Sequence, residues 1–400
     1  ALSILEYGRV RKPDSLLIRA FNPEADAHGW GSSHSIVEIV TDDMPFLVDS
    51  VVNQLARQGI SVSRIVHPVL KVRRTREGSI SRLHSAGASD TLAIAESFIH
   101  VELNQRCDDQ MLQQVVDGLT AVFGHVRLAV EDWAKMRARV ASVLAELDAN
   151  PPPIKHGELT ESKHFLRWLD DGHFTFLGCR DYKFSRRKGV TRPDIVAGSG
   201  LGILRGDKPT IFESLSSGTA LPPEVADFID QPRLLLIGKS PQRAPVQRNV
   251  YIDRIGVKQY NRRGEVIGEK LFLGLFTASA YNRSPAYIPL LRRKISQILK
   301  AAGVQTNSHN GKALLHVLET FPRDELFQIP SRELLAIASD IVHLQERHRT
   351  SFFLWGDPFE RFVTCLVYLP SERHSTDLRK KIQSILEEAF AGECRLYDTE

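Results

Sequence analysis

A short acidic segment that leads into an amphipathic stretch is the best candidate for a binding site. The segment TDDMPF contains Asp42, Asp43, Met44, Pro45 and Phe46, with the proline at an expected early helical position. Backbone N–H groups at a helix start favour a carboxylate or a phosphate, and the two acids could hold an ammonium group. We therefore interpret these five residues as an effector site for a free amino acid. The alternative is that Asp42 and Asp43 only cap the helix and offset its dipole.

The glycine-rich segment GSGLGILRG, residues 198–206, does not fit a dinucleotide-binding loop. Its spacing is GxGxG rather than GxGxxG, and Gly206 and Pro209 interrupt the helix that would have to follow. The sequence therefore predicts a flexible or tight turn here, with no Rossmann domain and no cofactor-binding residue.

Histidine, cysteine and serine residues are present, but their spacing fits no local catalytic or metal-binding motif. The 14 histidines include no HExxH pair, and the four cysteines, Cys107, Cys179, Cys365 and Cys394, include no CxxC pair. No GxSxG sequence marks a serine nucleophile. We expect no metal and no catalytic residue, although a triad assembled from distant residues stays open. Cysteines this scattered are typical of a cytoplasmic protein.

The charge of the chain is nearly balanced, with 52 Lys and Arg against 48 Asp and Glu in 400 residues. The basic runs at 292–294 and 379–381 stand on predicted amphipathic helices, and no aromatic stacking platform accompanies them. We interpret them as solvated faces or intersubunit ion pairs, and we expect no nucleic-acid partner. No stretch approaches the roughly 18 apolar residues of a membrane helix, so no membrane partner is expected.

The elements that must position the acidic segment follow a recognisable order within residues 35–130. The pattern predicts strand, helix, strand, strand, helix, strand, with the long second strand broken at Pro68 and a loop from Gly78 to Asp90. Gly59 should end the first helix, and HVRLAV at 125–130 should form the last strand. This β-α-β-β-α-β order is typical of a ferredoxin-like α+β module, in which both helices cover one face of an antiparallel sheet.

The rest of the chain divides at changes of pattern. The predicted parts are an N-terminal segment at 1–34, a connecting helix and proline-rich linker at 131–158, a second, insertion-bearing module at 159–304, a helical connector at 305–348, and the start of a third module at 349–400. Within the second module, a Gly/Pro-rich tract from about 185 to 209 is predicted to lack regular structure.

An internal repeat supports the prediction of related modules. A shift of 87 positions, the distance from Phe272 to Phe359, places one strand–loop–helix pattern on another without a gap. Because the second copy ends soon after its helix, and because the chain starts with Ala, we expect a fragment of a longer polypeptide.

Several segments together resemble the N-terminal region of the large bacterial NAD-specific glutamate dehydrogenases. They include DDMPFLVDSV, ISVSRIVHPVLKVRR, HFTFLGCRDY, GEVIGEKLFLGLFTASAY and FPRDELFQIP. The resemblance implies ACT-type modules joined by helical segments, with a Rossmann-bearing catalytic domain far downstream. It also implies a parent enzyme that uses NAD to deaminate L-glutamate oxidatively to 2-oxoglutarate and ammonia. Family ACT domains bind amino acids at the loop that corresponds to Asp42–Phe46, where glycine often follows the proline in place of Phe46.

The sequence thus predicts a noncatalytic regulatory and oligomerisation region, built from several ferredoxin-like modules. Its expected partners are its own catalytic domain, the other subunits of a homo-oligomer, and a free amino-acid effector. Two alternatives remain: a structural scaffold without any ligand, and an RNA-binding protein that uses ferredoxin-like sheets, for which the aromatic RNA-binding pattern is missing.

Overall fold

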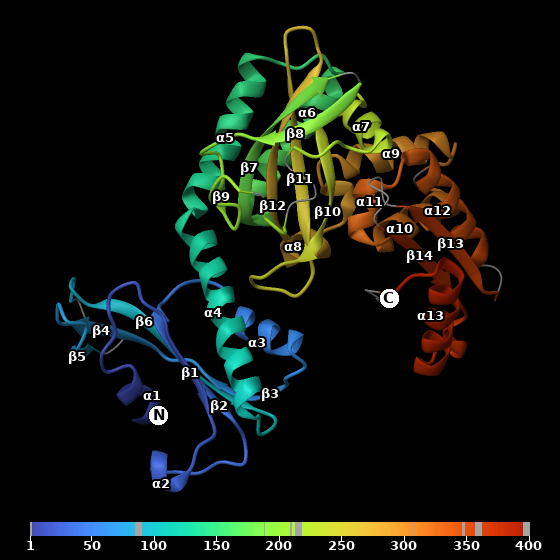
Figure 1. The fold of residues 1–400 in the computed structure, drawn as a ribbon. Helices are drawn as coiled ribbons and strands as arrows, with labels where there is room; N and C mark the ends of the chain where they lie inside the picture. The colour runs from blue at the N-terminus through green and yellow to red at the C-terminus, as the bar shows by residue number, and fades with distance from the viewer. Residues whose placement is uncertain are drawn as a thin grey trace. The chain divides into compact units, whose positions relative to one another are not determined.

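The computed structural model describes most of the chain, and the chain folds into two compact units. The described residues are 2–84, 90–187, 189–208, 210–212, 218–305, 307–345, 349–356 and 362–394. The first unit is Ala1–Ala278 and the second is Ser279–Glu400. Helices and antiparallel strands occur in both units (Figure 1), which confirms the predicted α+β class.

The first unit begins with an antiparallel sheet. Its strands are β1 (Leu17–Phe21), β2 (Ile36–Asp42), β3 (Val62–Val66), β4 (Val69–Arg74), β5 (Ile80–His84) and β6 (Ile94–Leu103). Their order across the sheet is β1-β2-β6-β4-β5, and β3 also pairs with β6. The helices of this module are α1 (Leu2–Tyr7), α2 (Ala25–His28), α3 (Leu47–Arg57) and α4 (Asp109–Glu131).

Both faces of the central strand β2 are covered, because residues 36–40 are all buried. On one face, Ile4 of α1 packs in a core cluster with Val40, Val72 and Phe98. The long helix α4 and the shorter α3 lie beside each other (Figure 1). Their buried apolar residues cover the other face of the sheet. Burial of both faces explains why apolar residues of β2 point to both sides of the sheet, with the buried Glu38, paired to Arg19, as the exception.

The prediction that HVRLAV at 125–130 forms the last strand is wrong, because these residues form the C-terminal part of α4. Buried side chains recur at helical spacing through the whole segment, and Val122, Val126 and Ala129 continue the apolar stripe. The sheet position beside β2, which the last strand of a ferredoxin-like module would occupy, is filled by β1 from the N-terminal segment. Antiparallel pairing runs from Leu17 opposite Val40 to Phe21 opposite Ile36.

Several local predictions in this module are confirmed. The break at Pro68 separates β3 from β4. α3 ends before Gly59, whose φ of 72° is left-handed, and the N–H of Ile60 bonds back to the carbonyl of Leu55. The loop predicted from Gly78 to Asp90 is wrong in part, because β5 lies inside it. As a largely exposed edge strand, β5 lacks the alternation of apolar residues that reveals a strand in a sequence.

A second antiparallel sheet completes the first unit. Its strands are β7 (Phe174–Arg187), β8 (Val190–Ile195), β9 (Leu201–Gly202), β10 (Leu235–Arg243), β11 (Tyr251–Tyr260) and β12 (Val266–Phe276), and its helices are α5 (Trp133–Ala149), α6 (His156–Trp168) and α7 (Pro223–Asp230). A π-helical turn, η1 (Leu169–His173), joins α6 to β7. The order across the sheet is β10-β11-β12-β7-β8, with β9 paired to β7.

The element order of this second sheet differs from the β-α-β-β-α-β order expected for 159–304. β7 is followed by β8 rather than by a helix, and β8 lies inside the tract that was predicted to lack regular structure. β11 and β12 are joined by a turn at 261–265, which is too short for a helix and includes Gly264 at a φ of 81°. The sheet is therefore antiparallel, as in a ferredoxin-like module, but its strands are connected differently from the expected order.

The second unit is mainly helical. Its helices are α8 (Ala278–Asn282), α9 (Leu291–Ala301), α10 (His309–Thr320), α11 (Arg323–Gln328), α12 (Ser331–Gln345) and α13 (Thr376–Phe390), with short 3-10 turns η2 (Pro285–Tyr287) and η3 (Ser371–Arg373). The strands β13 (Ser351–Gly356) and β14 (Val363–Tyr368) form an antiparallel hairpin. The sequence offers Asn307 or Ser308 as the N-cap of α10, and Ser308 is the one that caps it, since its hydroxyl accepts from the N–H of Gly311 at 3.1 Å.

The internal repeat is preserved only in its helices. The shift of 87 positions places α9 on α13 and η2 close to η3, but it places α8 on β14. The strand β12 of the first copy also belongs to the first unit, whereas its helix α9 belongs to the second. The likeness therefore reflects two similar amphipathic helices with similar approaches, and the strand match at Phe359 lies outside the described residues.

The glycines of α4 give a direct test of the helix through 125–130. No atom lies within 4 Å of a Cβ built on Gly124, so Gly124→Ala should raise the free energy of unfolding of the first unit by about 1 kcal/mol. Gly118→Ala is the matched control, because its Cβ would lie 2.5 Å from the side-chain nitrogen of Gln54. The free energy of unfolding should therefore rise less in Gly118→Ala than in Gly124→Ala. Denaturant unfolding measures both changes. A loss of stability in Gly124→Ala would contradict a helix at this position.

Candidate functional site

The predicted site segment connects β2 to α3 at one end of the first sheet. Asp42 is the last residue of β2 and stands opposite Glu96 of β6. The N–H of Asp43 then bonds to the carbonyl of Ala95 at 2.9 Å, so the chain leaves the sheet only after Asp43. Met44 is half-buried and Pro45 is exposed. The structure thus brings the five predicted residues together as one surface loop.

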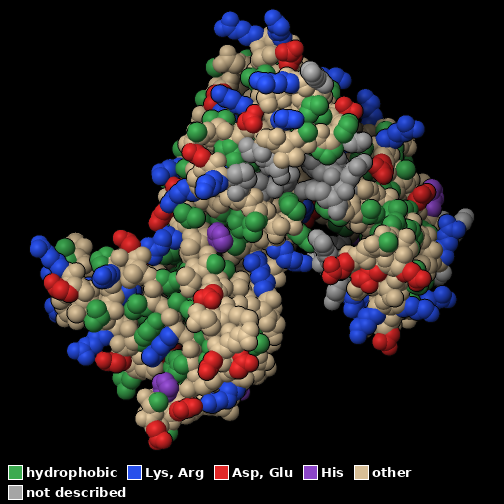
Figure 2. Space-filling view, in the orientation of Figure 1, with side chains coloured by type: hydrophobic (Ala, Val, Ile, Leu, Met, Phe, Trp, Pro, Cys, Tyr) green, Lys and Arg blue, Asp and Glu red, His purple; other side chains and the backbone are tan. Residues whose placement is uncertain are grey.

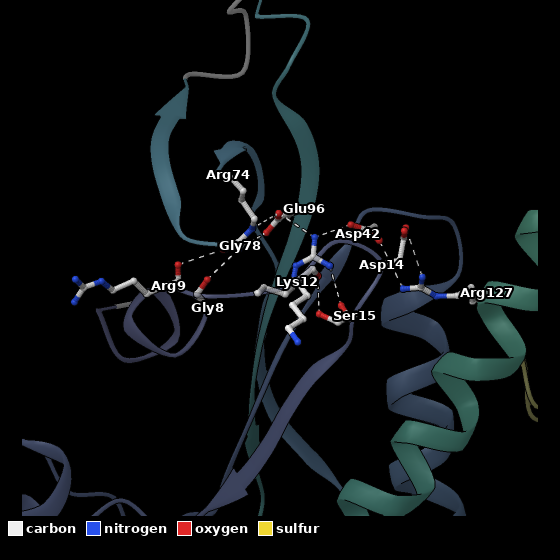
Figure 3. A network of polar contacts seen from close by, with 11 residues as sticks. Gly8, Arg9, Lys12, Asp14, Ser15, Asp42, Arg74, Gly78, Glu96 and Arg127 are labelled. Carbon is white, nitrogen blue, oxygen red and sulfur yellow. Dashed lines mark hydrogen bonds and ion pairs between the residues drawn. The ribbon is translucent and has the colours of Figure 1, made fainter. Parts of the chain in front are cut away.

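Asp42 is held by guanidinium groups from two distant segments. Its Oδ1 lies 2.6 Å from a terminal nitrogen of Arg11, and its Oδ2 lies 3.6 Å from Arg127 of α4. The side chain of Arg11 is fully buried and also lies 2.9 Å from Oε1 of Glu96. Asp42 is therefore occupied in an ion network (Figure 3) and is not available as the main partner of an ammonium group.

The same network continues behind the loop through Glu96 and Arg74. Arg74 donates to both carboxylate oxygens of Glu96, at 2.6 and 2.7 Å, and to the carbonyls of Gly78 at 2.7 Å and Gly8 at 2.9 Å. In Figure 3 these groups come from the N-terminal segment, the β4–β5 hairpin and β6. The network therefore ties three separate segments to the end of the sheet.

Mutual stabilisation of these charges appears in their pKa values. Burial alone would raise the pKa of Glu96, but hydrogen bonds from Arg74 and Arg11 outweigh it and leave the pKa below its usual 4.5. Burial alone would lower the pKa of Arg11, but hydrogen bonds to Glu96 and Asp42 raise it overall. Both groups are therefore charged in the folded protein at neutral pH.

Asp43 has a separate chain of contacts. Its Oδ1 accepts from the hydroxyl of Ser97 at 2.7 Å, and the ring Nε2 of His67 lies 2.9 Å from the same hydroxyl oxygen. These are the residue types of a serine triad, but their order is wrong for a nucleophile. The one hydroxyl hydrogen of Ser97 points to Asp43, so the His67 ring donates to Ser97 and does not remove its proton.

Neither aspartate caps α3, so the capping interpretation is wrong. The residue at the N-cap position is Phe46, which makes no side-chain hydrogen bond to the first turn. Its φ of 75° lies in the left-handed region that favours glycine. Phe46 therefore adopts the backbone conformation that a glycine at this position would adopt most easily. The first turn of α3 consequently begins without a side-chain cap, as an anion-binding helix start requires.

The other sequence candidates have structural roles. The loop 198–206 wraps around the buried Arg180, which donates to the carbonyl of Leu204 at 2.5 Å and to that of Gly206 at 3.1 Å. A phosphate needs N–H groups rather than carbonyls, so this loop does not fit NAD. Among the described residues, no group of three or more His, Cys, Asp and Glu side chains is arranged to hold a metal.

Two further sequence observations can be followed in the structure. Lys294 of the 292–294 basic run donates to the carbonyls of Leu326, at 2.6 Å, and Ile329. This is a helix-packing role rather than a phosphate contact. No helix in the part of the chain that the structure describes is long and apolar enough to cross a membrane.

Sequence reasoning missed the residues that surround the loop. They are His67, Ser97, Arg11, Arg74, Glu96 and Arg127. One signal was available, since Glu96 interrupts the apolar strand AESFIHVEL and a buried charge needs a partner. The identity of that partner was not available, because Arg11 is 85 positions from Glu96 in the chain.

The antiparallel sheet, the helices α3 and α4 and the loop between β2 and α3 define a ferredoxin-like module of the ACT type. Models of known families agree with this class. Residues 1–119 match the ACT1 domain of glutamate dehydrogenase, residues 288–347 match its helical motif 1, and residues 351–400 match its ACT2 domain.

Curated relatives extend the match over nearly the whole chain. The NAD-specific glutamate dehydrogenase of Halomonas elongata is 38% identical over 389 residues, which are 96% of this chain and 24% of that protein. That of Pseudomonas aeruginosa is 35% identical over 382 residues, 95% of this chain and 23% of the relative. That of Mycobacterium tuberculosis is 29% identical over 392 residues, 96% of this chain and 22% of the relative.

The chain belongs to the NAD-specific glutamate dehydrogenase family and corresponds to the N-terminal part of its larger members. It spans about a quarter of the length of the curated relatives that it matches. The resemblance seen in the sequence is therefore confirmed.

The pKa of Glu96 leads to a prediction about pH. Because the folded-state pKa is lowered, the stabilisation that Glu96 provides is present above about pH 4.5 and is lost as the pH falls through the lower folded value. Glu96→Gln should reduce the free energy of unfolding of the first unit by about 3 kcal/mol at pH 7 and should weaken the further loss of that free energy as the pH falls below about 4.5. Denaturant unfolding across this pH range measures both effects.

Glu6→Gln is the control for this experiment, since the Glu6 side chain is 74% exposed beside Arg9. It should leave both the stability and its pH dependence nearly unchanged. Equal pH profiles for Glu96→Gln and the unmodified chain would show that the buried carboxylate does not contribute as stated.

Proposed function

We propose that this chain is the noncatalytic regulatory and assembly region of an enzyme that deaminates L-glutamate oxidatively to 2-oxoglutarate and ammonia with NAD. The name of the three relatives, NAD-specific glutamate dehydrogenase, supports the reaction and the cofactor. The ACT1 match over residues 1–119 supports a regulatory role. In this proposal NAD binds to a part of the enzyme other than these 400 residues, and the region works in a cytoplasmic homo-oligomer.

The regulatory role consists of sensing a free amino acid at Asp42–Phe46. The observation that carries this proposal is the uncapped first turn of α3, which begins beside the exposed Asp43. The N–H groups of that turn suit the carboxylate of an amino acid. Asp43 suits its ammonium group, because Ser97 bonds only to Oδ1 and, among the described residues, none forms a hydrogen bond or ion pair with Oδ2. An α-amino acid carries both charges at the separation of one carbon atom.

A scaffold without a ligand is the second candidate, and the ion pairs of Asp42 with Arg11 and Arg127 favour it. In this case the acidic loop only anchors the N-terminal segment to the sheet. An RNA-binding role has less support, since Lys and Arg side chains are interspersed with Asp and Glu on the face shown in Figure 2 rather than gathered in a stripe.

Titration calorimetry with each of the 20 standard amino acids tests the sensing role on this chain and on the whole enzyme. At least one should bind, and Asp43→Asn should weaken its binding about tenfold, the equivalent of about 1.4 kcal/mol for a charge-assisted contact. Phe46→Gly should retain binding, because glycine accepts the same φ without strain.

Asp109→Asn is the matched control, since Asp109 is also an exposed carboxylate in the first turn of a helix, at the start of α4. It should leave the affinity unchanged. Absence of heat for every amino acid, in the chain and in the whole enzyme, would remove the sensing role and leave the scaffold.

A further inference from the structure

The helix that begins at the candidate loop also contacts the second sheet of the first unit. Ser50, Asn53 and Arg57 stand three and four positions apart, so they lie on one side of α3. All three contact the segment 244–250, which connects β10 to β11. We call this segment the β10–β11 connection.

Polar contacts from α3 fix the backbone of the β10–β11 connection. The hydroxyl of Ser50 accepts from the N–H of Gln247 at 3.1 Å, and the side-chain amide of Asn53 donates to the carbonyl of the same residue. Arg57 donates to the carbonyl of Ala244 and, at 3.0 Å, to the side-chain oxygen of Asn249. Three of these four contacts reach main-chain atoms, so they depend on the path of the connection more than on its side chains.

The centre of this contact is a backbone conformation that needs support. Gln247 has a φ of 69°, a left-handed value that costs a residue other than glycine about 1 kcal/mol or more. α3 bonds to both its N–H and its carbonyl, and Ala244 and Val246 beside it are each 1% exposed. A strained residue persists only where its surroundings determine it, and here α3 supplies part of those surroundings.

A second, independent connection joins the same two sheets through α4. His125 packs edge-to-face on Phe212 with ring centroids 5.3 Å apart. At the end of α4, Asp132 accepts from the N–H of Gly202 at 3.0 Å and pairs with Arg205 at 2.8 Å. Both α3 and α4 thus contact elements of the second sheet, so a shift of α3 along α4 would alter its contact with the β10–β11 connection.

We propose that α3 couples the loop Asp42–Phe46 to the β10–β11 connection through Ser50, Asn53 and Arg57. The geometric link is short, since the N–H of Ser50 bonds to the carbonyl of Phe46 at 3.0 Å while its hydroxyl bonds to Gln247. One residue thus joins the start of the helix to the strained residue of the second sheet. The biological use of this coupling, as the output of an amino-acid sensor, rests on the proposed function.

Hydrogen exchange of the 400-residue chain, read by mass spectrometry on peptides that cover 244–250, tests the coupling without any ligand. Glycine adopts the left-handed φ of Phe46 but also many other conformations, so Phe46→Gly lets the start of α3 move more freely, and exchange in the β10–β11 connection should become about threefold faster or more. The same change in a chain that also carries Ser50→Ala, Asn53→Ala and Arg57→Ala should have no further effect, because the contacts that transmit it are gone.

Val52→Ala is the control, because Val52 lies on the same helix but is 38% exposed. It should leave exchange at 244–250 unchanged. Should the triple change unfold the first unit, Ser50→Ala with Asn53→Ala removes both contacts to Gln247, and its comparison with and without Phe46→Gly takes the place of the triple variant. Unchanged exchange in Phe46→Gly, or equal acceleration with and without the α3 contacts, would overturn the coupling.

The hydrogen-exchange experiment tests the coupling, and the calorimetric experiment tests the proposed function, so one can fail without the other. Coupled exchange together with no calorimetric heat would retain the mechanical link and remove the sensor. Ligand heat without coupled exchange would retain the sensor and remove the link.

Discussion

The path of α4 is the constraint on which the rest of the first unit depends. A ferredoxin-like module normally returns to its own sheet after the second helix, but here the apolar stripe continues through Val126 and Ala129 and carries the chain to the second sheet. The sheet position thus left beside β2 is filled from the N-terminal side by β1. A continuous helix between two sheets transmits force better than a loop would, since each of its residues is held by its own backbone hydrogen bonds. In the first unit α4 therefore links its two sheets by an unbroken helical backbone.

Buried charge gives the module its second distinctive property. Removing Arg11 and Glu96 from water costs several kcal/mol for each ion, and only close, well-aligned pairing offsets that cost. The pairing here reaches into three segments, which backbone hydrogen bonds such as that from the N–H of Arg11 to the carbonyl of Gly78, at 3.0 Å, also join. Apolar contacts would tolerate small slides of those segments, whereas the fork of Arg74 on Glu96 accepts only one arrangement. The network thus fixes where the N-terminal segment crosses the end of the sheet, and with it the position of Asp42.

The sequence predicted local structure well where one face or both faces of an element were buried. The strand that ends at Asp42, the helix that ends at Gly59 and the break at Pro68 all have signals within a few residues. It failed where the deciding partner was distant. Val126 belongs to a helix because β1, more than 100 positions earlier, already fills the competing place in the sheet. The edge strand β5 has no apolar alternation to recognise.

The same reason limits the prediction of the site. The five loop residues were identified from their types, but the opposite environments of Asp42 and Asp43 depend on Arg11 and Ser97, which the sequence does not place beside them. The left-handed φ of Phe46 was likewise hidden, because aromatic residues rarely adopt it.

The strand β1 has a protective consequence for the whole region. β2 presents five consecutive buried residues, 36–40, and without β1 the outer edge of that apolar strand would expose unpaired N–H and C=O groups. Such an edge is a template for pairing with other chains. A protease cut between β1 and β2 that released β1 would open this edge of β2 to other chains, so β1 acts as the cover of that edge.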